Sequence, residues 1–364
     1  MEYFEVVLLI AITSWIIKPN EKCNESKKIF SIIAAAILIL FCSCRKFTVG
    51  YDGASYLMKF RQIANAGWVD ILSKAPFGKI YQVEFGYAFL NKVISVTVSD
   101  YQWVIAICST ITVINFMIFI YKNSKHLLFS TILLICEGTL ISTFTLQRQA
   151  VALSFVLVAW SFWNEGKKRK SILFCICAMM FHQSAIVCVL LIFLSRFSPR
   201  KRTFWLLIGG GVAVSVGYPF VIRIAAKIFP HLMSYVNGNF YELDIGGVIV
   251  LWIIEISVCV ILICTRNFGF CSKTVKEKIG VKAEFYSCVF TCYYILFYLL
   301  ATQYDLAERI GLYFRPFVLI LIPAISDRVD KKYKPFIDSA LILGFCFFLY
   351  LQTQGVYSYT VFWK

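Results

Sequence analysis

Charged residues are scarce in this chain of 364 residues: they make up 15% of it, and only 20 are acidic. Soluble domains carry about a quarter charged residues, so the composition excludes a soluble enzyme. Apolar side chains make up 60% of the sequence, and the mean hydropathy is +0.75. We therefore predict an integral membrane protein, an all-α bundle that forms one membrane domain over residues 1–364.

Histidine is also rare, with 3 residues, and most of the 14 cysteines lie inside apolar runs. Cysteine in such runs behaves as a small hydrophobe, and no polar segment brings His and Cys together at the spacing of a zinc site. The sequence therefore predicts neither a disulfide framework nor a metal centre. The N-terminal segment lacks a basic n-region and a small-residue cleavage site, so we expect it to be retained as the first membrane helix.

Long apolar segments predict about ten membrane spans. They lie at roughly 3–17, 29–44, 101–121, 127–144, 147–163, 203–220, 246–264, 283–301, 309–325 and 336–351. Several are shorter than the roughly 20 residues that cross a bilayer, so we expect these spans to include flanking polar residues.

Six basic loops, at 18–28, 121–126, 167–170, 196–202, 266–282 and 327–334, orient these spans. Because cytoplasmic loops collect Lys and Arg, placing all six in the cytoplasm gives a consistent topology with both termini outside. It also accounts for the net charge of +16 without nucleic acid. Two segments cannot be ordinary membrane spans in this topology. Within a periplasmic loop at 45–100, segment 83–99 is predicted to be an amphipathic helix on the outer face. Segment 171–194 has basic clusters at both ends and is predicted to be a re-entrant helical hairpin with "FHQS" at its tip.

The cations left on the outer face are enriched in arginine, which can bind phosphate in a bidentate manner. Arg148 lies at the seam between two apolar runs, Arg309 and Arg315 flank the outer start of a helix, and Arg45 directly follows an early span. An arginine at this depth indicates an anionic partner. The alternative is that each reaches lipid headgroups or pairs with a nearby carboxylate.

Three residues on the same face are candidates for a general base. His182 lies at the tip of the predicted hairpin, although a lone histidine in a membrane is more often a packing residue. Asp52 lies in the turn "GYDG", where its side chain could simply form the turn. Glu84 begins the amphipathic helix and could simply interact with the helix dipole. We rank them in the order His182, Asp52, Glu84.

Five stretches follow one another in an order that resembles the EpsG/Wzy-type polysaccharide polymerases of bacteria. They are "RKFTVGYDGASY", "EFGY", "RQAVA", "FHQSA" and "ERIGLYFRPF", and the resemblance covers about 45 to 325. It implies a multi-pass glycosyltransferase of the GT-C-like class in the bacterial inner membrane, with its active site facing the periplasm. The implied donor is glycan on undecaprenyl diphosphate and the acceptor a new lipid-linked repeat unit. The product would be O-antigen, capsule or exopolysaccharide.

The resemblance also implies roles for the candidate residues. Stabilisation of the leaving diphosphate falls to Arg148, Arg309 and Arg315, with Arg45 supporting. The base is His182, Asp52 or Glu84. Asp52 and Glu84 alone supply few of the oxygen ligands that a divalent cation binds, so we expect no metal and no other cofactor. The expected partners are lipid-linked oligosaccharide units and the bilayer. A chain-length-regulating membrane protein is allowed as a further partner, and no nucleic acid is expected.

Two other functions compete with this prediction. A flippase or transporter of lipid-linked oligosaccharides also needs arginines, but its polar residues should continue to the inner face. A membrane O-acyltransferase that modifies surface glycan needs an acyl-CoA site or an acyl relay, for which His182 is poorly placed. The polar intramembrane residues cluster towards the outside, which favours the polymerase.

Overall fold

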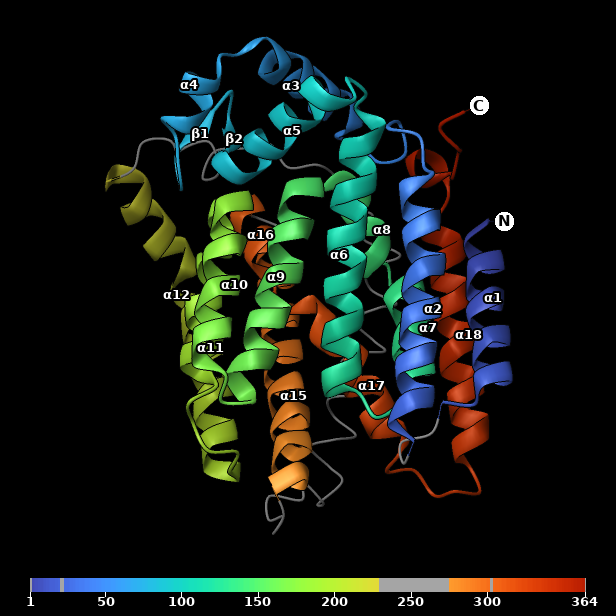
Figure 1. Ribbon diagram of the computed structural model, residues 1–364. Helices are drawn as coiled ribbons and strands as arrows, with labels where there is room; N and C mark the ends of the chain where they lie inside the picture. Colours follow the sequence, from blue (N-terminus) through green and yellow to red (C-terminus); the bar gives the residue numbers. More distant parts are fainter. Residues whose placement is uncertain (1, 20–22, 229–274, 302–303, 364) are drawn as a thin grey trace. The chain divides into compact units, whose positions relative to one another are not determined.

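The computed structural model describes residues 2–19, 23–228, 275–301 and 304–363 (Figure 1). The chain divides into two compact units, which are described separately. The first comprises Met1–Val189 and Lys331–Lys364, and the second Leu190–Asp330. The described residues are mostly helical, and their one sheet is a two-stranded antiparallel hairpin.

The first unit combines long helices with a group of short elements at one end of them. The long helices and their continuations are α1 (Glu2–Ile17), α2 (Asn24–Ser43), α6 (Gln102–Asn123), α7 (Leu127–Cys136), α8 (Thr139–Thr145), α9 (Gln147–Asn164), α10 (Lys168–Phe181) and α18 (Lys334–Gln352). The short elements are α3 (Gly53–Asn65), α4 (Trp68–Leu72), β1 (Lys79–Ile80), β2 (Val83–Glu84) and α5 (Phe85–Thr97). We call these short elements of the first unit the cap. In Figure 1 the cap lies over the ends of α6, α9 and α10.

Over the residues that the structure describes, the second unit contains two long helices and a broken third segment. Its elements are α12 (Lys201–Ile228), α15 (Val275–Ala301), α16 (Asp305–Gly311), the 3-10 turn η3 (Arg315–Phe317) and α17 (Val318–Ser326). Gly211 of α12 lies so close to the Tyr293 ring of α15 that an added Cβ would be 2.5 Å from it. The Tyr293 hydroxyl donates to the carbonyl of Leu207 at 2.7 Å, which joins the same two helices.

Within the described residues, six helical stretches are long and apolar enough to cross a membrane, or seven if α7 and α8, bent by 42°, count as one span. The six are Asn24–Ser43, Gln102–Asn123, Lys201–Ile224, Lys282–Ala301, Leu306–Ser326 and Lys334–Gln352. The chain is thus an all-α, multi-pass membrane protein, as the composition predicts. The expected segment 246–264 lies outside the described residues, so the count of about ten spans stays a prediction, as does the GT-C-like class.

The two segments that are not predicted to be ordinary spans, 83–99 and 171–194, both contain helices. The segment expected over 83–99 contains β2 and α5. The segment expected over 171–194 contains α10, the 3-10 turn η1 (Gln183–Ile186) and α11 (Val187–Leu194). The thiols of Cys175 and Cys188 lie within hydrogen-bonding distance, whereas a continuous helix would hold them about 20 Å apart. The chain therefore turns back at His182–Ile186, and the re-entry of this turn into a membrane stays a prediction.

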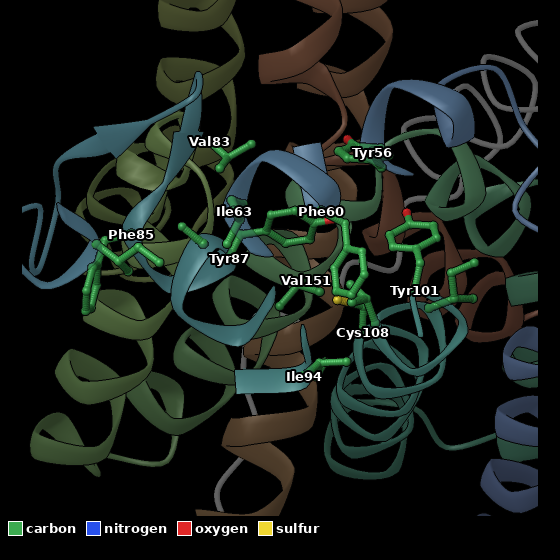
Figure 2. Packing of buried hydrophobic residues seen from close by; sticks show 14 of the residues in the cluster. Tyr56, Phe60, Ile63, Val83, Phe85, Tyr87, Ile94, Tyr101, Cys108 and Val151 are labelled. Atoms are coloured by element: carbon green, nitrogen blue, oxygen red, sulfur yellow. The ribbon is translucent and has the colours of Figure 1, made fainter. Parts of the chain in front are cut away.

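An apolar core fastens the cap to the long helices. One stripe of α3, formed by Tyr56, Phe60 and Ile63, repeats at helical spacing and is buried. Figure 2 shows this stripe packed with residues of α5, α6 and α9, among them Tyr87, Cys108 and Val151. Burying each such large side chain stabilises the fold by about 1.5–3 kcal/mol. The core therefore holds the polar side chains of the cap in place.

Candidate active site

A buried ion pair joins the cap to the start of α9. Nη1 of Arg148 lies 2.5 Å from Oε2 of Glu84, whose side chain is only 2% exposed, while the Arg148 side chain is 15% exposed. The same Nη1 donates to the carbonyl of Gln82 at 3.1 Å. On the other carboxylate oxygen, Oε1, the backbone N–H of Gln183 donates at 3.3 Å and Nζ of Lys79 lies at 3.7 Å. Glu84 thus connects the β1–β2 hairpin, α9 and the turn after α10.

The turn of the β1–β2 hairpin positions the two groups that bind Arg148, the Gln82 carbonyl and the Glu84 carboxylate. Strands β1 and β2 are joined by Tyr81 and Gln82, whose φ angles are 50° and 64°. Two successive positive φ values are the pattern of a type I′ hairpin turn, which Asn and Gly normally supply. A non-glycine residue in this region costs about 1–3 kcal/mol. Contacts elsewhere in the fold offset this cost. In this turn conformation, the Gln82 carbonyl and the Glu84 carboxylate both reach the guanidinium of Arg148.

The other edge of Arg148 faces α3. Its Cζ lies 5.9 Å from the centroid of the Tyr56 ring, and its buried Nε has no hydrogen-bond partner within the described parts of the chain. Burial raises the pKa of Tyr56, and the charge of Arg148 opposes that shift. Burial also lowers the pKa of Lys59, and Arg148 lowers it further, against the opposite effect of Asp52 and Glu84. Arg148 therefore lies within electrostatic reach of two residues on one face of α3, Tyr56 and Lys59.

Asp52 presents an exposed carboxylate that lies within electrostatic reach of Tyr56 and Lys59, the same two residues of α3. It is the N-cap residue of α3, but its side chain accepts no capping hydrogen bond. The loop before it packs tightly: an added Cβ on Gly50, whose φ is 103°, would lie 2.9 Å from the backbone of Phe144, and one on Gly53 would lie 1.6 Å from the Phe47 carbonyl. Only glycine fits at these two positions. The backbone around Asp52 is therefore held in place while its carboxylate stays open.

His182 lies next to Gln183, which binds Glu84. Its Nδ1 accepts a hydrogen bond from the backbone N–H of Ser184 at 3.2 Å and lies 2.6 Å from the Ser184 hydroxyl. A ring that accepts at Nδ1 carries its proton on Nε2 when neutral. This tautomer suits a hydrogen-bond donor better than a general base. The geometry thus favours Asp52 over His182 as the base, the reverse of the order that the sequence suggests.

The remaining arginines have other surroundings. Arg45 is buried: its Nη1 donates to the Cys42 carbonyl at 2.5 Å and to the Ser109 hydroxyl at 2.8 Å, and its Cζ lies 4.4 Å from the centroid of the Phe144 ring. These contacts join α2, α6 and α8. Arg309 and Arg315 belong to the second unit, where Arg315 is buried and its Cζ lies 5.9 Å from the centroid of the Tyr294 ring. Their diphosphate-binding roles stay predictions.

The C-terminal tail pairs with the loop that carries Asp52, a contact that no pattern in the sequence indicates. Three backbone N–H groups donate to carbonyls across the two segments: Phe362 to Cys44 at 2.9 Å, Lys46 to Thr360 at 2.7 Å and Gly50 to Val356 at 3.1 Å. The hydroxyls of Tyr357 and Thr145 are 2.9 Å apart, and Thr145 accepts from the backbone N–H of Tyr51 at 3.1 Å. The tail thereby buttresses the Asp52 loop.

We expect Tyr357→Phe to loosen that loop. The variant removes the hydroxyl that orients Thr145, the partner of the Tyr51 amide, at a cost of about 1 kcal/mol. Hydrogen exchange measured by mass spectrometry in detergent should become faster over 45–52. Tyr359→Phe is the matched control, because it removes a hydroxyl that donates to the Phe41 carbonyl at 2.7 Å instead. Equal exchange over 45–52 in the two variants would contradict this role of the tail.

Sequence reasoning missed several members of the site. Lys59 and Lys79 are not among the candidates that the sequence suggests, although the helical spacing of Asp52, Tyr56 and Lys59 places these three on one face of α3. The Gln82 carbonyl and the Gln183 amide are backbone groups, for which the sequence contains no signal. Within the first unit the structure brings together Glu84, Arg148 and the His182 turn, and it places Asp52 within electrostatic reach of Tyr56 and Lys59, which Arg148 also reaches.

The sequence profile of the EpsG family matches residues 28–362, a range that includes every residue of this site. The comparisons with curated proteins and with solved structures give no match.

Proposed function

The chain belongs to the EpsG family, and on this premise we propose that it is a polysaccharide polymerase. In this proposal it is a membrane glycosyltransferase that transfers undecaprenyl-diphosphate-linked glycan onto a new lipid-linked repeat unit. The reaction takes place at the periplasmic face of the bacterial inner membrane and builds O-antigen, capsule or exopolysaccharide. The observation that carries the proposal is the arginine held by Glu84, together with the open carboxylate of Asp52, which acts on the same residues of α3, Tyr56 and Lys59, as Arg148 does.

Arg148 is suited to bind the leaving diphosphate. One edge of its guanidinium is fixed by Glu84 and Gln82, while its Nε has no partner that would have to be displaced. Donors that are fixed before the reaction stabilise developing charge strongly in a water-poor site. Arg148, Lys59 and Lys79 together carry three positive charges against the two negative charges of Glu84 and Asp52. The site therefore favours an anion.

Asp52 is suited to activate the acceptor sugar. The acceptor hydroxyl gives its proton to the Asp52 carboxylate as its oxygen bonds to the anomeric carbon of the donor. The bond from that carbon to the diphosphate breaks, and the electron pair leaves with the phosphate oxygen towards Arg148. Glu84 has both oxygens engaged, so it acts as a positioning residue, and His182 acts as a hydrogen-bond donor.

A gene deletion followed by a reconstituted assay tests this proposal. Deletion should collapse the ladder of surface glycan to single repeat units on their carrier, and the wild-type gene should restore it. Purified protein in liposomes should lengthen added lipid-linked units. Arg61→Ala, which removes an exposed arginine from α3, should also restore the ladder and serves as the control.

Two outcomes would overturn the proposal in different ways. Loss of all surface glycan, single units included, together with no extension in liposomes, would identify a flippase or transporter. A ladder of unchanged length with altered sugar modification would identify an O-acyltransferase.

A further inference from the structure

An exposed tyrosine directly precedes the proposed base. Tyr51 is the neighbour of Asp52 in the chain and is 66% exposed. An exposed side chain is ordinarily free to change rotamer, and fixing it costs conformational entropy. In this structure, however, both the backbone and the ring of Tyr51 are fixed by other segments of the first unit. The reaction proposed above gives this ring no role.

The backbone of Tyr51 is held against the junction of α8 and α9. Its N–H donates to Oγ1 of Thr145 at 3.1 Å, and Thr145 is the last residue of α8, three positions before Arg148. The N–H of the preceding residue, Gly50, donates to the Val356 carbonyl at 3.1 Å. The loop is thus fixed both to the helix junction that presents Arg148 and to the C-terminal tail.

The ring of Tyr51 is oriented by Tyr357 of the tail. The centroids of the two rings are 5.6 Å apart and their planes cross at 87°, the edge-to-face arrangement that aromatic pairs favour. Tyr357 is itself held at two points. Its carbonyl accepts from the hydroxyl of Tyr3, a buried residue of α1, at 2.8 Å, and its own hydroxyl lies 2.9 Å from Oγ1 of Thr145. The tail therefore orients a ring that stays largely exposed.

An oriented and exposed aromatic ring is suited to bind a sugar. The face of the ring is negative, whereas the C–H groups on one face of a pyranose are apolar and weakly positive. Contact between these two faces buries apolar surface and leaves the sugar hydroxyls free for other partners. Because the ring is oriented before the sugar arrives, binding requires little further ordering of the protein.

We propose that Tyr51 is a sugar-binding platform on which the terminal sugar of the acceptor stacks. The assignment to the acceptor rests on the proposed function, in which Asp52 is the base. Consecutive Cα atoms lie about 3.8 Å apart, less than the width of a pyranose ring, so a sugar stacked on Tyr51 can present a hydroxyl to the Asp52 carboxylate. The platform also gives a reason for the pairing between the tail and this loop.

The test measures sugar binding separately from glycan extension. The probe consists of short oligosaccharides released by partial acid hydrolysis from the surface glycan of the source cells. Their binding to the purified full-length protein in nanodiscs is measured by isothermal titration calorimetry. Tyr51→Ala should weaken binding about 10-fold, the contribution of one well-oriented aromatic contact. Tyr51→Phe keeps the ring and should bind as wild type does.

The matched control is Tyr333→Ala, which removes another exposed tyrosine. Tyr333 is 54% exposed and precedes α18, whereas the tail follows the far end of that helix, about 28 Å away. This variant should bind as wild type does. Equal binding by wild type and Tyr51→Ala would make Tyr51 an ordinary residue of the membrane–water interface and overturn the proposal. A loss in Tyr51→Phe as large as in Tyr51→Ala, or no binding by wild type, would also overturn it.

Thermal unfolding of each variant without sugar identifies a loss that comes from misfolding. If Tyr51→Ala is misfolded, Tyr51→Leu is measured instead. Leucine keeps an apolar side chain without a ring, so this variant should bind more weakly than Tyr51→Phe. Equal binding by these two variants would overturn the proposal.

The platform and the polymerase can fail separately. Binding that depends on Tyr51, in a protein that does not lengthen lipid-linked units in liposomes, would support the platform and overturn the polymerase. Extension by wild type, with oligosaccharide binding that Tyr51→Ala leaves unchanged, would support the polymerase and overturn the platform. If both hold, Tyr51→Ala should raise the KM for lipid-linked units about 10-fold and leave kcat nearly unchanged, because the ring binds the sugar equally in the ground state and the transition state.

Discussion

Replacing Arg148 with lysine is expected to lower the rate of glycan extension about 100- to 1,000-fold while the protein still folds, because one preorganised donor to a developing oxyanion contributes that much. Lysine keeps the positive charge that Glu84 requires. It is a point charge, however, and cannot bind Glu84, the Gln82 carbonyl and a phosphate at once, as the guanidinium can. The measurement is the initial rate at which purified protein in liposomes lengthens lipid-linked repeat units.

Two further variants separate folding from catalysis. Arg148→Ala leaves the Glu84 carboxylate, 2% exposed, without this cation, which should reduce the free energy of unfolding by about 3–5 kcal/mol. Arg148→Gln combined with Glu84→Gln removes both charges and should recover much of that stability while remaining inactive. Wild-type extension by Arg148→Lys would show that the guanidinium does not bind the leaving group.

Replacing Asp52 with asparagine is expected to slow extension about 100- to 10,000-fold, the usual contribution of a general base. Stability should hardly change, because the side chain is exposed and makes no capping hydrogen bond. The asparagine side chain has nearly the same shape but cannot accept the proton of the sugar hydroxyl. Extension rates and thermal unfolding of the same purified samples provide the two readouts.

The matched control is Asp70→Asn, which changes another exposed carboxylate of the cap. Asp70 accepts from the backbone N–H of Gly67 at 3.2 Å, a bond that an asparagine oxygen can also accept. Its extension rate should equal that of wild type. If Asp52→Asn also extends glycan at the wild-type rate, Asp52 is not the base and His182 becomes the leading candidate.

The pairing of Glu84 with Arg148 shows where prediction from the sequence stops. The sequence singles out each residue: Arg148 as an arginine at a seam between apolar runs, and Glu84 as an acid at a helix start. That the two form one ion pair depends on the positive φ angles of Tyr81 and Gln82, which nothing in the residue types indicates. His182 shows the same limit, because its tautomer depends on the Ser184 backbone.

Arg45 and the C-terminal tail also make contacts that the sequence does not predict. From the sequence, Arg45 looks like an outward arginine available to a phosphate, whereas in the structure its guanidinium binds Cys42 and Ser109. The tail lies outside the five stretches that suggest the family from the sequence, yet it pairs with the loop that carries Asp52. Both contacts join residues far apart in the chain, so local patterns contain no information about them.

The sequence by itself determined that this protein is an all-α membrane protein, where most of its helices lie, and which ionisable residues deserve attention. Composition and helical periodicity report whether each segment is buried in an apolar environment, and that is a local property. Only the tertiary structure decided which of those residues meet: Glu84 with Arg148, and the His182 turn with Glu84 through the backbone N–H of Gln183. These groupings arise from packing between distant segments, where turn geometry and backbone hydrogen bonds set the distances.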